Sequence, residues 1–322
     1  MRLQIRRRFW PVLFGLLLCT ALPAFAQQAW PDRPVRVVVP YAAGGATDAV
    51  TRAFADSMAR KLGQPIVVEN RAGGGTNIAA ALVAKAPPDG HTLLVTNIAS
   101  NVLNRALYRR LDYDPASFAH AGMMARSTMC LVVAPNFQAR SLAELVTMAR
   151  QRPNGLTYAS NGIGTPTHLL GEMLRQRTGL PLTHVPYGGS AQSNLDLLAG
   201  RVDFMFDACT LANSGQLHAL AVTFPERWPG LPNVPAMVEQ GMAGMELTTF
   251  FGLAGPRGTP EAALARLEAA IAAAAAEPEV VQRFAPTGFI PFVLDRAQTA
   301  EFLRRETENW TRVIRAAEIS LD

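Results

Sequence analysis

Four loops that contain glycine give this 322-residue chain its clearest binding chemistry, which is main-chain N–H groups at helix starts. Each loop follows a short apolar run and precedes a helical pattern; the loops are Pro40–Asp48, Arg71–Thr76, Asn161–His168 and Val185–Ser190. The first turn of a helix leaves N–H groups without partners and carries about half a positive charge, and glycine lets a ligand come close. One such loop could simply turn a corner, but four at the carboxyl ends of strands favour a shared anion site without Lys or Arg.

Side chains in and near these loops have more than one possible role. Thr165 is expected to cap a helix that starts at Pro166, and Ser190 to cap the next one. Asp48 and Asp207 could each brace their own loops. Alternatively, each could accept a hydrogen bond from a ligand hydroxyl, an ammonium group or an ordered water.

Other chemistries lack their sequence signatures. The P-loop motif is absent, and neither G-x-G run, at Gly73 and at Gly162, has a small residue at the third position of a dinucleotide fingerprint. There is no G-x-S-x-G elbow, no C-x-x-C or H-E-x-x-H motif, and no triad-like arrangement of the histidines. His168 could donate to a ligand or be a partly buried structural histidine. We therefore expect no catalytic residue, no metal site and no cofactor.

Alternating strand and helix patterns position these loops. Apolar runs predict strands at 35–39, 66–68, 92–96, 130–134, 156–159, 182–185, 202–206 and 217–222. Helical spacing predicts helices at 48–62, 77–85, 142–150, 166–177 and 191–198. This alternation predicts an α/β fold with mostly parallel sheets and helices on both faces. From Pro260 the pattern changes to two long helices, 261–276 and 296–317, with little strand signal, and we expect them to fold back as a cap.

The N-terminal segment has the order of a bacterial secretory signal peptide. Residues 1–8 are basic, residues 12–22 are largely apolar, and Ala24-Phe25-Ala26 is a small-x-small cleavage signature. We expect cleavage after Ala26 and an exported, periplasmic protein. Four of the 30 Lys and Arg residues lie in this leader, so the remaining 26 nearly balance the 25 Asp and Glu residues. This balance excludes nucleic acid as an expected partner.

Two cysteines remain after the leader. Cys130 and Cys209 each lie in apolar sequence, so two buried thiols are the default prediction, and a disulfide in an oxidising compartment is the alternative.

Motifs along almost the whole chain resemble those of one family, the substrate-binding receptors of tripartite tricarboxylate transporters, also called Bug receptors. The matching motifs are Trp30-Pro31-x-Arg33-Pro34-Val35-Arg36, Pro40-Tyr41-x-x-Gly44-Gly45-x-x-Asp48, Val68-Glu69-Asn70-Arg71-x-Gly73, Pro88-Asp89-Gly90-His91-Thr92-Leu93, Tyr113-Asp114-Pro115, Gly162-x-Gly164-Thr165-x-x-His168-Leu169, Val185-Pro186-Tyr187, Leu231-Pro232-x-Val234-Pro235 and Gly255-Pro256-x-Gly258-Thr259-Pro260.

The resemblance implies a type II periplasmic binding protein, with two α/β lobes that close over a ligand. We expect the chain to cross between lobes near 123–127 and 246–250, which gives lobe 1 as residues 27–125 plus 248–322 and lobe 2 as residues 126–247. By motif, the ligand-binding residues would be Tyr41, Ala43, Gly44, Gly45, Asp48, Gly162, Gly164, Thr165, His168 and Tyr187. Asn97 and Asp207 occupy further positions where we expect contacts with the ligand. Two departures concern ligand choice: Gly188 stands where the family often has Lys, and Phe250-Phe251 replaces a common Trp.

The function that the resemblance implies is capture of a small carboxylate for delivery to a membrane permease. The carboxylate could be a di- or tricarboxylate, an amino acid or an aromatic acid, and we expect a monomer. Two other functions stay open: a ligand sensor that signals to a membrane histidine kinase, and, more remotely, an exported hydrolase.

Overall fold

The computed structural model describes residues 30–284, 286, 288–316 and 321. The predicted leader and its cleavage site after Ala26 lie outside these residues. The strands are β1 (Val35–Val39), β2 (Ile66–Asn70), β3 (Thr92–Asn97), β4 (Ala119–Val133), β5 (Leu156–Ser160), β6 (Leu182–Pro186), β7 (Phe204–Ala208), β8 (His218–Val222), β9 (Thr248–Gly255) and β10 (Phe289–Leu294).

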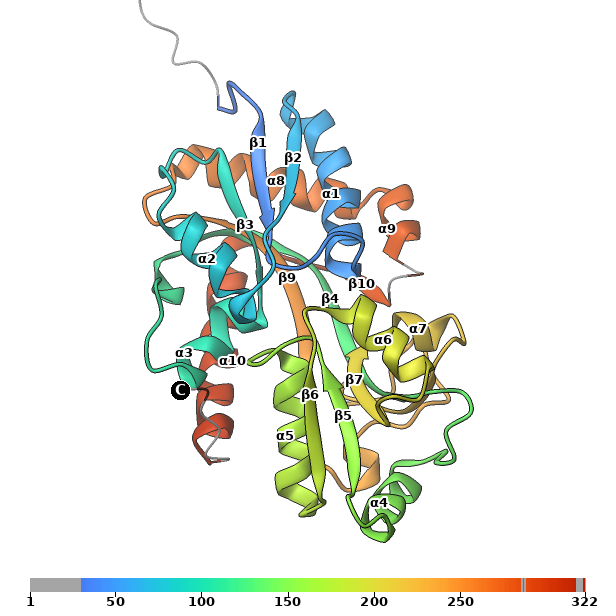
Figure 1. Ribbon diagram of the computed structural model, residues 1–322. Helices are drawn as coiled ribbons and strands as arrows, with labels where there is room; N and C mark the ends of the chain where they lie inside the picture. The colour runs from blue at the N-terminus through green and yellow to red at the C-terminus, as the bar shows by residue number, and fades with distance from the viewer. Residues whose placement is uncertain (1–29, 285, 287, 317–320, 322) are drawn as a thin grey trace, which may run out of the picture.

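The helices are α1 (Ala46–Leu62), α2 (Asn77–Ala84), α3 (Asn104–Leu107), α4 (Leu142–Gln151), α5 (Pro166–Thr178), α6 (Ser190–Leu198), α7 (Thr210–Asn213), α8 (Glu261–Ala275), α9 (Pro278–Phe284) and α10 (Arg296–Ala316), with a further helical turn, η2 (Ala99–Leu103), before α3. Most of the predicted strands and helices are confirmed to within a few residues. Figure 1 shows them gathered into two halves around one curled sheet.

The sheet has the strand order β2-β1-β3-β9-β4-β7-β5-β6, and β8 and β10 also pair with β4. The predicted parallel pairing holds for β2-β1-β3 in one half and for β6-β5-β7 in the other. The strands between these triplets pair antiparallel with their neighbours.

Strand β4 passes from one half of the sheet into the other. Residues Ala119–Thr128 pair with β9, whereas Met129–Val133 pair with β7 and β8. Only the second part was predicted as a strand. We propose that the two lobes are residues 27–125 plus 248–322 and residues 126–247, with β4 and the start of β9 as the connections between them.

Apolar side chains pack where the helical spacing predicts. Val50, Phe54, Met58 and Leu62 of α1 are all buried in one cluster with strand residues such as Val37. This single buried face is what a four-residue repeat produces on a helix.

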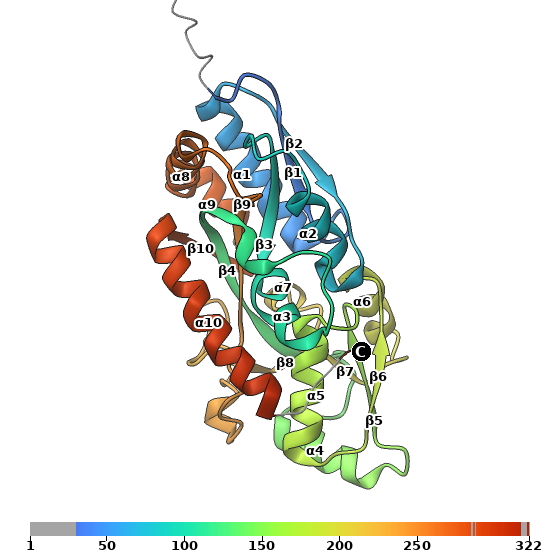
Figure 2. The ribbon, with the colours of Figure 1, turned by 90° about the vertical axis from the view of Figure 1, so that its left-hand side faces the viewer.

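The C-terminal part forms the predicted helical cap, with additions. Helix α8 packs against α1 and β4, and α10 lies along β4, β10 and η2 (Figure 2). Leu303, Trp310 and Ile314 are buried apolar residues of α10. Strand β10 and helix α9, which lie between the two long helices, were not predicted.

The default prediction of two separate buried thiols is wrong. Cys130 on β4 and Cys209, just after β7, form a disulfide. Because β4 and β7 are antiparallel neighbours, with Cys130 opposite Asp207, the two cysteines lie within reach of each other.

No helix in the described part of the chain is both long and apolar enough to span a membrane.

Candidate ligand-binding site

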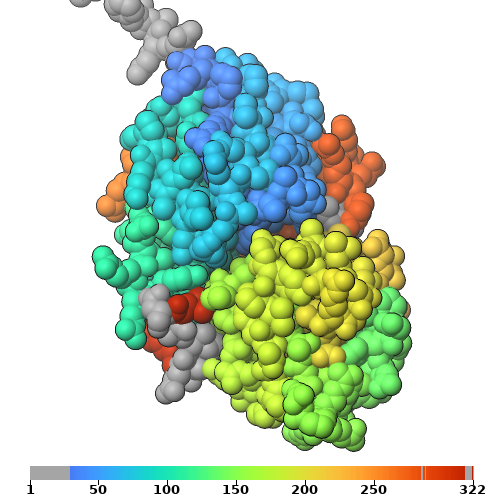
Figure 3. Space-filling model, in the orientation of Figure 1, coloured from blue at the N-terminus to red at the C-terminus, as the bar shows by residue number. Residues whose placement is uncertain are grey.

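A cavity of about 280 Å³ lies between the two halves of the sheet. One half contributes Tyr41–Ala43 and Gly45–Thr47 to its wall, and the other contributes Thr165–Thr167, Gly188–Gln192 and Asp207–Ala208. In the space-filling view, the halves meet along a line across the middle of the molecule, with blue and cyan residues above and green and yellow residues below (Figure 3). The volume suits a small ligand.

Three helices begin at this cavity. Helices α1, α5 and α6 have Gly45, Thr165 and Gly189 at their N-cap positions, and none of the three caps makes a side-chain hydrogen bond to its helix. By contrast, Ser141 caps α4, away from the cavity, by accepting from the Glu144 N–H. The first-turn N–H groups of three helices and their dipoles therefore favour an anion in this cavity.

Ser190 does not occupy the predicted cap position. It is the first residue of α6, and Gly189 precedes it as the N-cap. Thr165 is the N-cap of α5, but its hydroxyl donates to the carbonyl oxygen of Gly162 at 2.7 Å instead of accepting from a main-chain N–H of the helix. The hydroxyl of Ser190 donates to Asp207 at the end of β7.

A second cavity of about 340 Å³ adjoins the first. The two share Tyr41, Asn161, Thr165 and Gly188, and the second also reaches Gly73–Thr76. All four glycine loops therefore meet at these two cavities. The loops approach closely here, since a Cβ added to Gly75 would lie 3.1 Å from the carbonyl oxygen of Ile163 in the other half.

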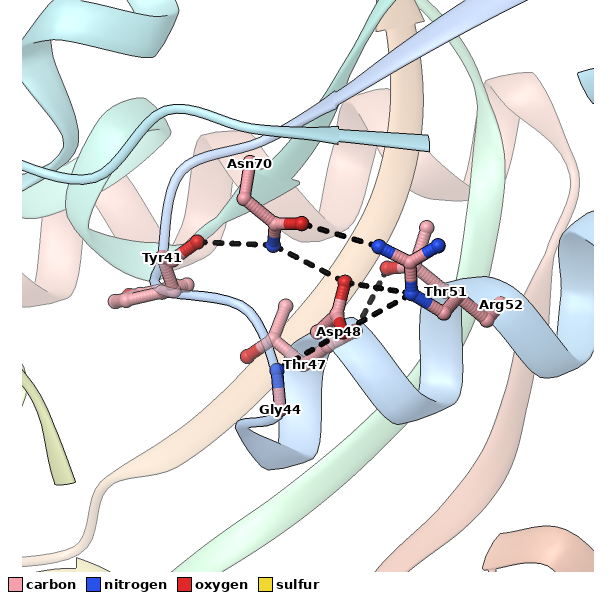
Figure 4. A network of polar contacts seen from close by, with 7 residues as sticks. All are labelled: Tyr41, Gly44, Thr47, Asp48, Thr51, Arg52 and Asn70. Atoms are coloured by element: carbon pink, nitrogen blue, oxygen red, sulfur yellow. Dashed lines mark hydrogen bonds and ion pairs between the residues drawn. The ribbon is translucent and has the colours of Figure 1, made fainter. Parts of the chain in front are cut away.

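Asp48 holds the first loop, Pro40–Asp48, through hydrogen bonds, and its own side chain does not line the cavity (Figure 4). Its carboxylate accepts from the Gly44 N–H at 3.0 Å, from Nε of Arg52 at 3.0 Å and from Nδ2 of Asn70 at 3.0 Å. The same Asn70 nitrogen donates to the carbonyl oxygen of Tyr41 at 3.0 Å. Burial acts to raise the pKa of Asp48, but the hydrogen bonds from Arg52, Gly44 and Asn70 outweigh it, so this pKa lies below its usual value.

Because Asp48 is the acceptor for the first loop, Asp48→Asn is expected to lower the free energy of unfolding by about 1–3 kcal/mol. The new amide nitrogen cannot accept, so one of the donors around it loses its partner. Urea unfolding measures the change. Asp56→Asn on the same helix is the control, because Asp56 is exposed and pairs only with Arg283 among the ion pairs described. Equal stability of the two variants would contradict the bracing role.

Asp207 has the corresponding place in the other half, but it also lines the cavity. Its carboxylate accepts from Nδ2 of Asn161 at 3.0 Å, from the hydroxyl of Ser190 at 3.1 Å and from Nδ2 of Asn194 at 3.1 Å. Burial raises the pKa of Asp207 in spite of these hydrogen bonds. The residue thereby links the loop after β5 to the start of α6.

His168 supports the third loop from outside both cavities. Its Nδ1 accepts from the Gly164 N–H at 3.3 Å, and its ring stacks on His184 with 4.2 Å between centroids. His184 in turn lies 2.7 Å from the hydroxyl of Ser160. Burial, assisted by His168, lowers the pKa of His184 to about 4. Burial also lowers the pKa of His168, although Glu172 opposes the shift.

The lowered pKa values of these histidines make the folding stability depend on pH. An unfolded histidine titrates near 6.5, so between about pH 4 and 6.5 the unfolded chain binds more protons at His184 than the folded chain does. The contribution is therefore complete above this window and is lost as the pH falls through it. We expect Tm to drop by several degrees between pH 7.5 and pH 5, and to drop less in His184→Gln. Identical drops in the two proteins would contradict the assignment.

The sequence of this chain matches those of known proteins along most of its length. A sequence profile described as the tripartite tricarboxylate transporter family receptor matches residues 50–319. The chain belongs to this receptor family. A protein from Pseudomonas sp. strain P51, named for the tcbD-tcbE intergenic region, is 39% identical over 323 residues, covering 96% of this chain and 94% of that protein.

Solved structures of similar proteins share the receptor fold. The periplasmic binding protein BugD is 32% identical with a TM-score of 0.85, over 91% of this chain and 100% of that one. A Rhodopseudomonas palustris protein solved with adipate is 35% identical with a TM-score of 0.85, over 91% and 100% of the two chains. MatC from the same organism, solved with bound malate, is 32% identical with a TM-score of 0.82, over 88% and 100%.

These relatives confirm the predicted two-lobed α/β fold of a periplasmic binding protein. The receptor family is one of periplasmic solute-binding proteins and not of enzymes.

The receptor brings most of its predicted site residues to the two cavities. Tyr41, Ala43, Gly45, Thr165 and Asp207 line the first cavity, and Gly162 and Tyr187 line the second. Gly44 and Gly164 lie within the same loops and direct their N–H groups to Asp48 and His168. The hydroxyl of Tyr187 is engaged, because it donates to Asp196 at 2.9 Å.

Besides Gly44 and Gly164, three of the predicted residues lie outside the cavity linings of this receptor. Asp48 and His168 brace loops, as described above. Asn97 ends β3, where its Oδ1 accepts from the Ser100 N–H at 3.1 Å and its side chain is buried. These residues turn inward because each satisfies main-chain donors of its own loop.

The prediction missed the apolar back wall of the receptor's cavity, which consists of Met129, Phe251 and Phe289. These residues come from β4, β9 and β10. An apolar residue on a strand has the same sequence pattern whether it faces the core or a cavity, so only the replacement of a family Trp at Phe250-Phe251 pointed to this region.

Proposed function

We propose that this receptor captures a small carboxylate in the periplasm and delivers it to an integral-membrane permease of the tripartite type. The convergence of three helix N-termini on one cavity supports this function, because main-chain N–H groups can hold a carboxylate without an ion pair. The carboxylates adipate and malate in the structures of two relatives support the same ligand class.

The proposed binding residues are those of the glycine loops on both sides of the cavity. Tyr41, Ala43 and Gly45 would contact the ligand from one lobe, and Thr165 and Gly162 from the other. Since the ligand would touch both lobes only when they are closed, it would stabilise the closed form. A permease that recognises the closed form would then distinguish loaded from empty receptor.

Binding of a carboxylate is tested by comparing each carboxylic acid with its uncharged amide. Purified receptor is heated with each of a panel of carboxylic acids and with the corresponding uncharged amides, and Tm is measured. A ligand at 100 times its Kd stabilises a protein by about 2.7 kcal/mol, so at least one acid is expected to raise Tm while its amide does not. If every acid is inert, or if amides act as strongly as acids, the proposal is wrong.

Delivery is tested separately by uptake of the labelled acid into cells. Deletion of the receptor gene should abolish high-affinity uptake, and the purified receptor added back to spheroplasts should restore it. Loss of signalling with normal uptake would instead favour the sensor function.

A further inference from the structure

The back wall of the cavity is built from large apolar side chains. Met129, Phe251 and Phe289 line it and are 4%, 5% and 4% exposed. The rings of Phe251 and Phe289 contact each other, with 5.0 Å between centroids and an interplanar angle of 48°. Pro166 and Ala208 extend this apolar surface on the side of the other lobe. A ligand body against this wall would lose its contact with water and gain only apolar neighbours.

Asn161, Ser190 and Thr165, three polar residues of the cavity lining, already make hydrogen bonds within the receptor. Asn161 donates to Asp207 through its amide nitrogen and accepts from Ser193 through its amide oxygen, at 3.0 and 3.2 Å. Ser190 also donates to Asp207. Thr165 donates to a main-chain carbonyl. A ligand hydroxyl that faces Met129, Phe251 or Phe289 would find no hydrogen-bond partner on this wall, which costs free energy in a buried site.

The anionic group of a ligand and the rest of its body would meet different surroundings in this cavity. Among the described residues that line it, Asp207 is the one carboxylic acid, burial raises its pKa, and no Lys, Arg or His is present. An anionic group is therefore stabilised at the helix N-termini and not at any side chain. The rest of the ligand is left to face Met129 and the two phenylalanines.

From these observations, we infer that the receptor selects carboxylic acids whose body is an unhydroxylated hydrocarbon, either a chain or a ring, over hydroxylated acids of the same length. This inference rests on the proposed function, because it concerns the substrate class of the same site. Burial of each CH₂ group favours binding, whereas each unpaired hydroxyl opposes it. An apolar pocket rejects a ligand that adds one hydroxyl by about 100-fold.

Pairs of acids that differ only in hydroxyl groups test the inference. Adipate and galactarate share a six-carbon chain with two terminal carboxylates, and hexanoate and gluconate share a six-carbon chain with one. Binding of all four to the full exported receptor is measured by calorimetry. We expect the unhydroxylated member of at least one pair to bind, and to bind at least 100-fold more tightly than its hydroxylated partner.

The possible results separate the two proposals. If galactarate or gluconate binds as tightly as its partner, the inference is wrong while carboxylate capture stands. If no carboxylic acid in this set or in the wider panel binds, carboxylate capture itself is wrong.

A substitution in the back wall tests whether this wall causes the preference for unhydroxylated acids. Met129→Gln keeps the length of the side chain but adds an amide, so we expect the preference for the unhydroxylated acid to fall at least tenfold. Met148→Gln is the control, because Met148 is only partly buried on α4, away from the cavity. An unchanged preference in a folded Met129→Gln protein would contradict the role of the wall, and the ligand pairs test the inference even if this variant does not fold.

Discussion

Gly164→Val is expected to abolish the stabilisation of the receptor by its ligand while the unliganded protein still folds. Gly164 has a φ of +81°, which a valine adopts only with strain. A Cβ at this position would also lie 2.6 Å from the hydroxyl of Tyr108 and 2.8 Å from Cδ1 of Leu321. The loop must therefore move away from Tyr108, which belongs to the other half, and the N–H groups at the start of α5 move with it. We expect affinity to fall at least 100-fold.

Gly179→Val is the matched control for Gly164→Val. Gly179 ends the same helix, α5, and has a φ of +62°, but a Cβ there would meet no atom within 4 Å. Both variants should lose about 1–2 kcal/mol through backbone strain, but only Gly164→Val should lose ligand binding. Thermal shift with saturating acid measures both effects. Equal ligand responses in the two variants would show that the loop of Gly164 is not part of the site.

Gly44→Val should reduce binding for a different reason. Gly44 also has a φ of +81°, but no atom lies within 4 Å of an added Cβ. Its effect would come from the change in backbone conformation, which breaks the N–H contact to Asp48 and turns the start of α1.

Reduction of the Cys130–Cys209 disulfide is expected to cause the largest loss of stability. The bond closes a loop with a sequence separation of 79 residues, and loop entropy for this length gives about 4.5 kcal/mol, near the upper end of the range for disulfides. We expect a clear drop in Tm and in the urea midpoint when reductant is added.

The double variant Cys130→Ala/Cys209→Ala supplies the control for this prediction. Reductant should not change the Tm of the double variant, and this Tm should lie close to that of the reduced receptor. If reductant lowers both proteins equally, its effect does not act through this bond. Ligand binding measured in parallel is informative, because Met129 and Ala208, the cavity residues next to the two cysteines, lie opposite each other on β4 and β7.

Local sequence patterns were enough to predict the parallel strands, the helices beside them and the loops between. The face of α1 that carries Val50, Phe54 and Met58 shows why: its repeat directly reports which side is buried. Strand β10 was missed because Pro291 interrupts its apolar residues and weakens the strand pattern. The first part of β4 was missed because Gly122 and Arg126 interrupt its apolar residues, although strands on both sides hold it in place.

The site was predictable only where main-chain geometry decides it. Glycine loops can be recognised directly in the sequence. They converge because each follows the carboxyl end of a parallel strand, and these ends lie at the same edge of the sheet. The roles of Asp48 and Asp207 depend on partners elsewhere in the chain, Asn70 and Asn161, and no local pattern contains such distances. The disulfide likewise follows from the register of β4 against β7 and not from the residues around either cysteine.

The course of β4 has a mechanical consequence. The strand continues unbroken between the two triplets of parallel strands and places Met129 at the back of the cavity. A tilt of one triplet against the other must bend this strand, so the bending point and a wall of the cavity lie on the same stretch of backbone. A bulky acid would contact β4 at this point, and its size would limit how far the two lobes can close.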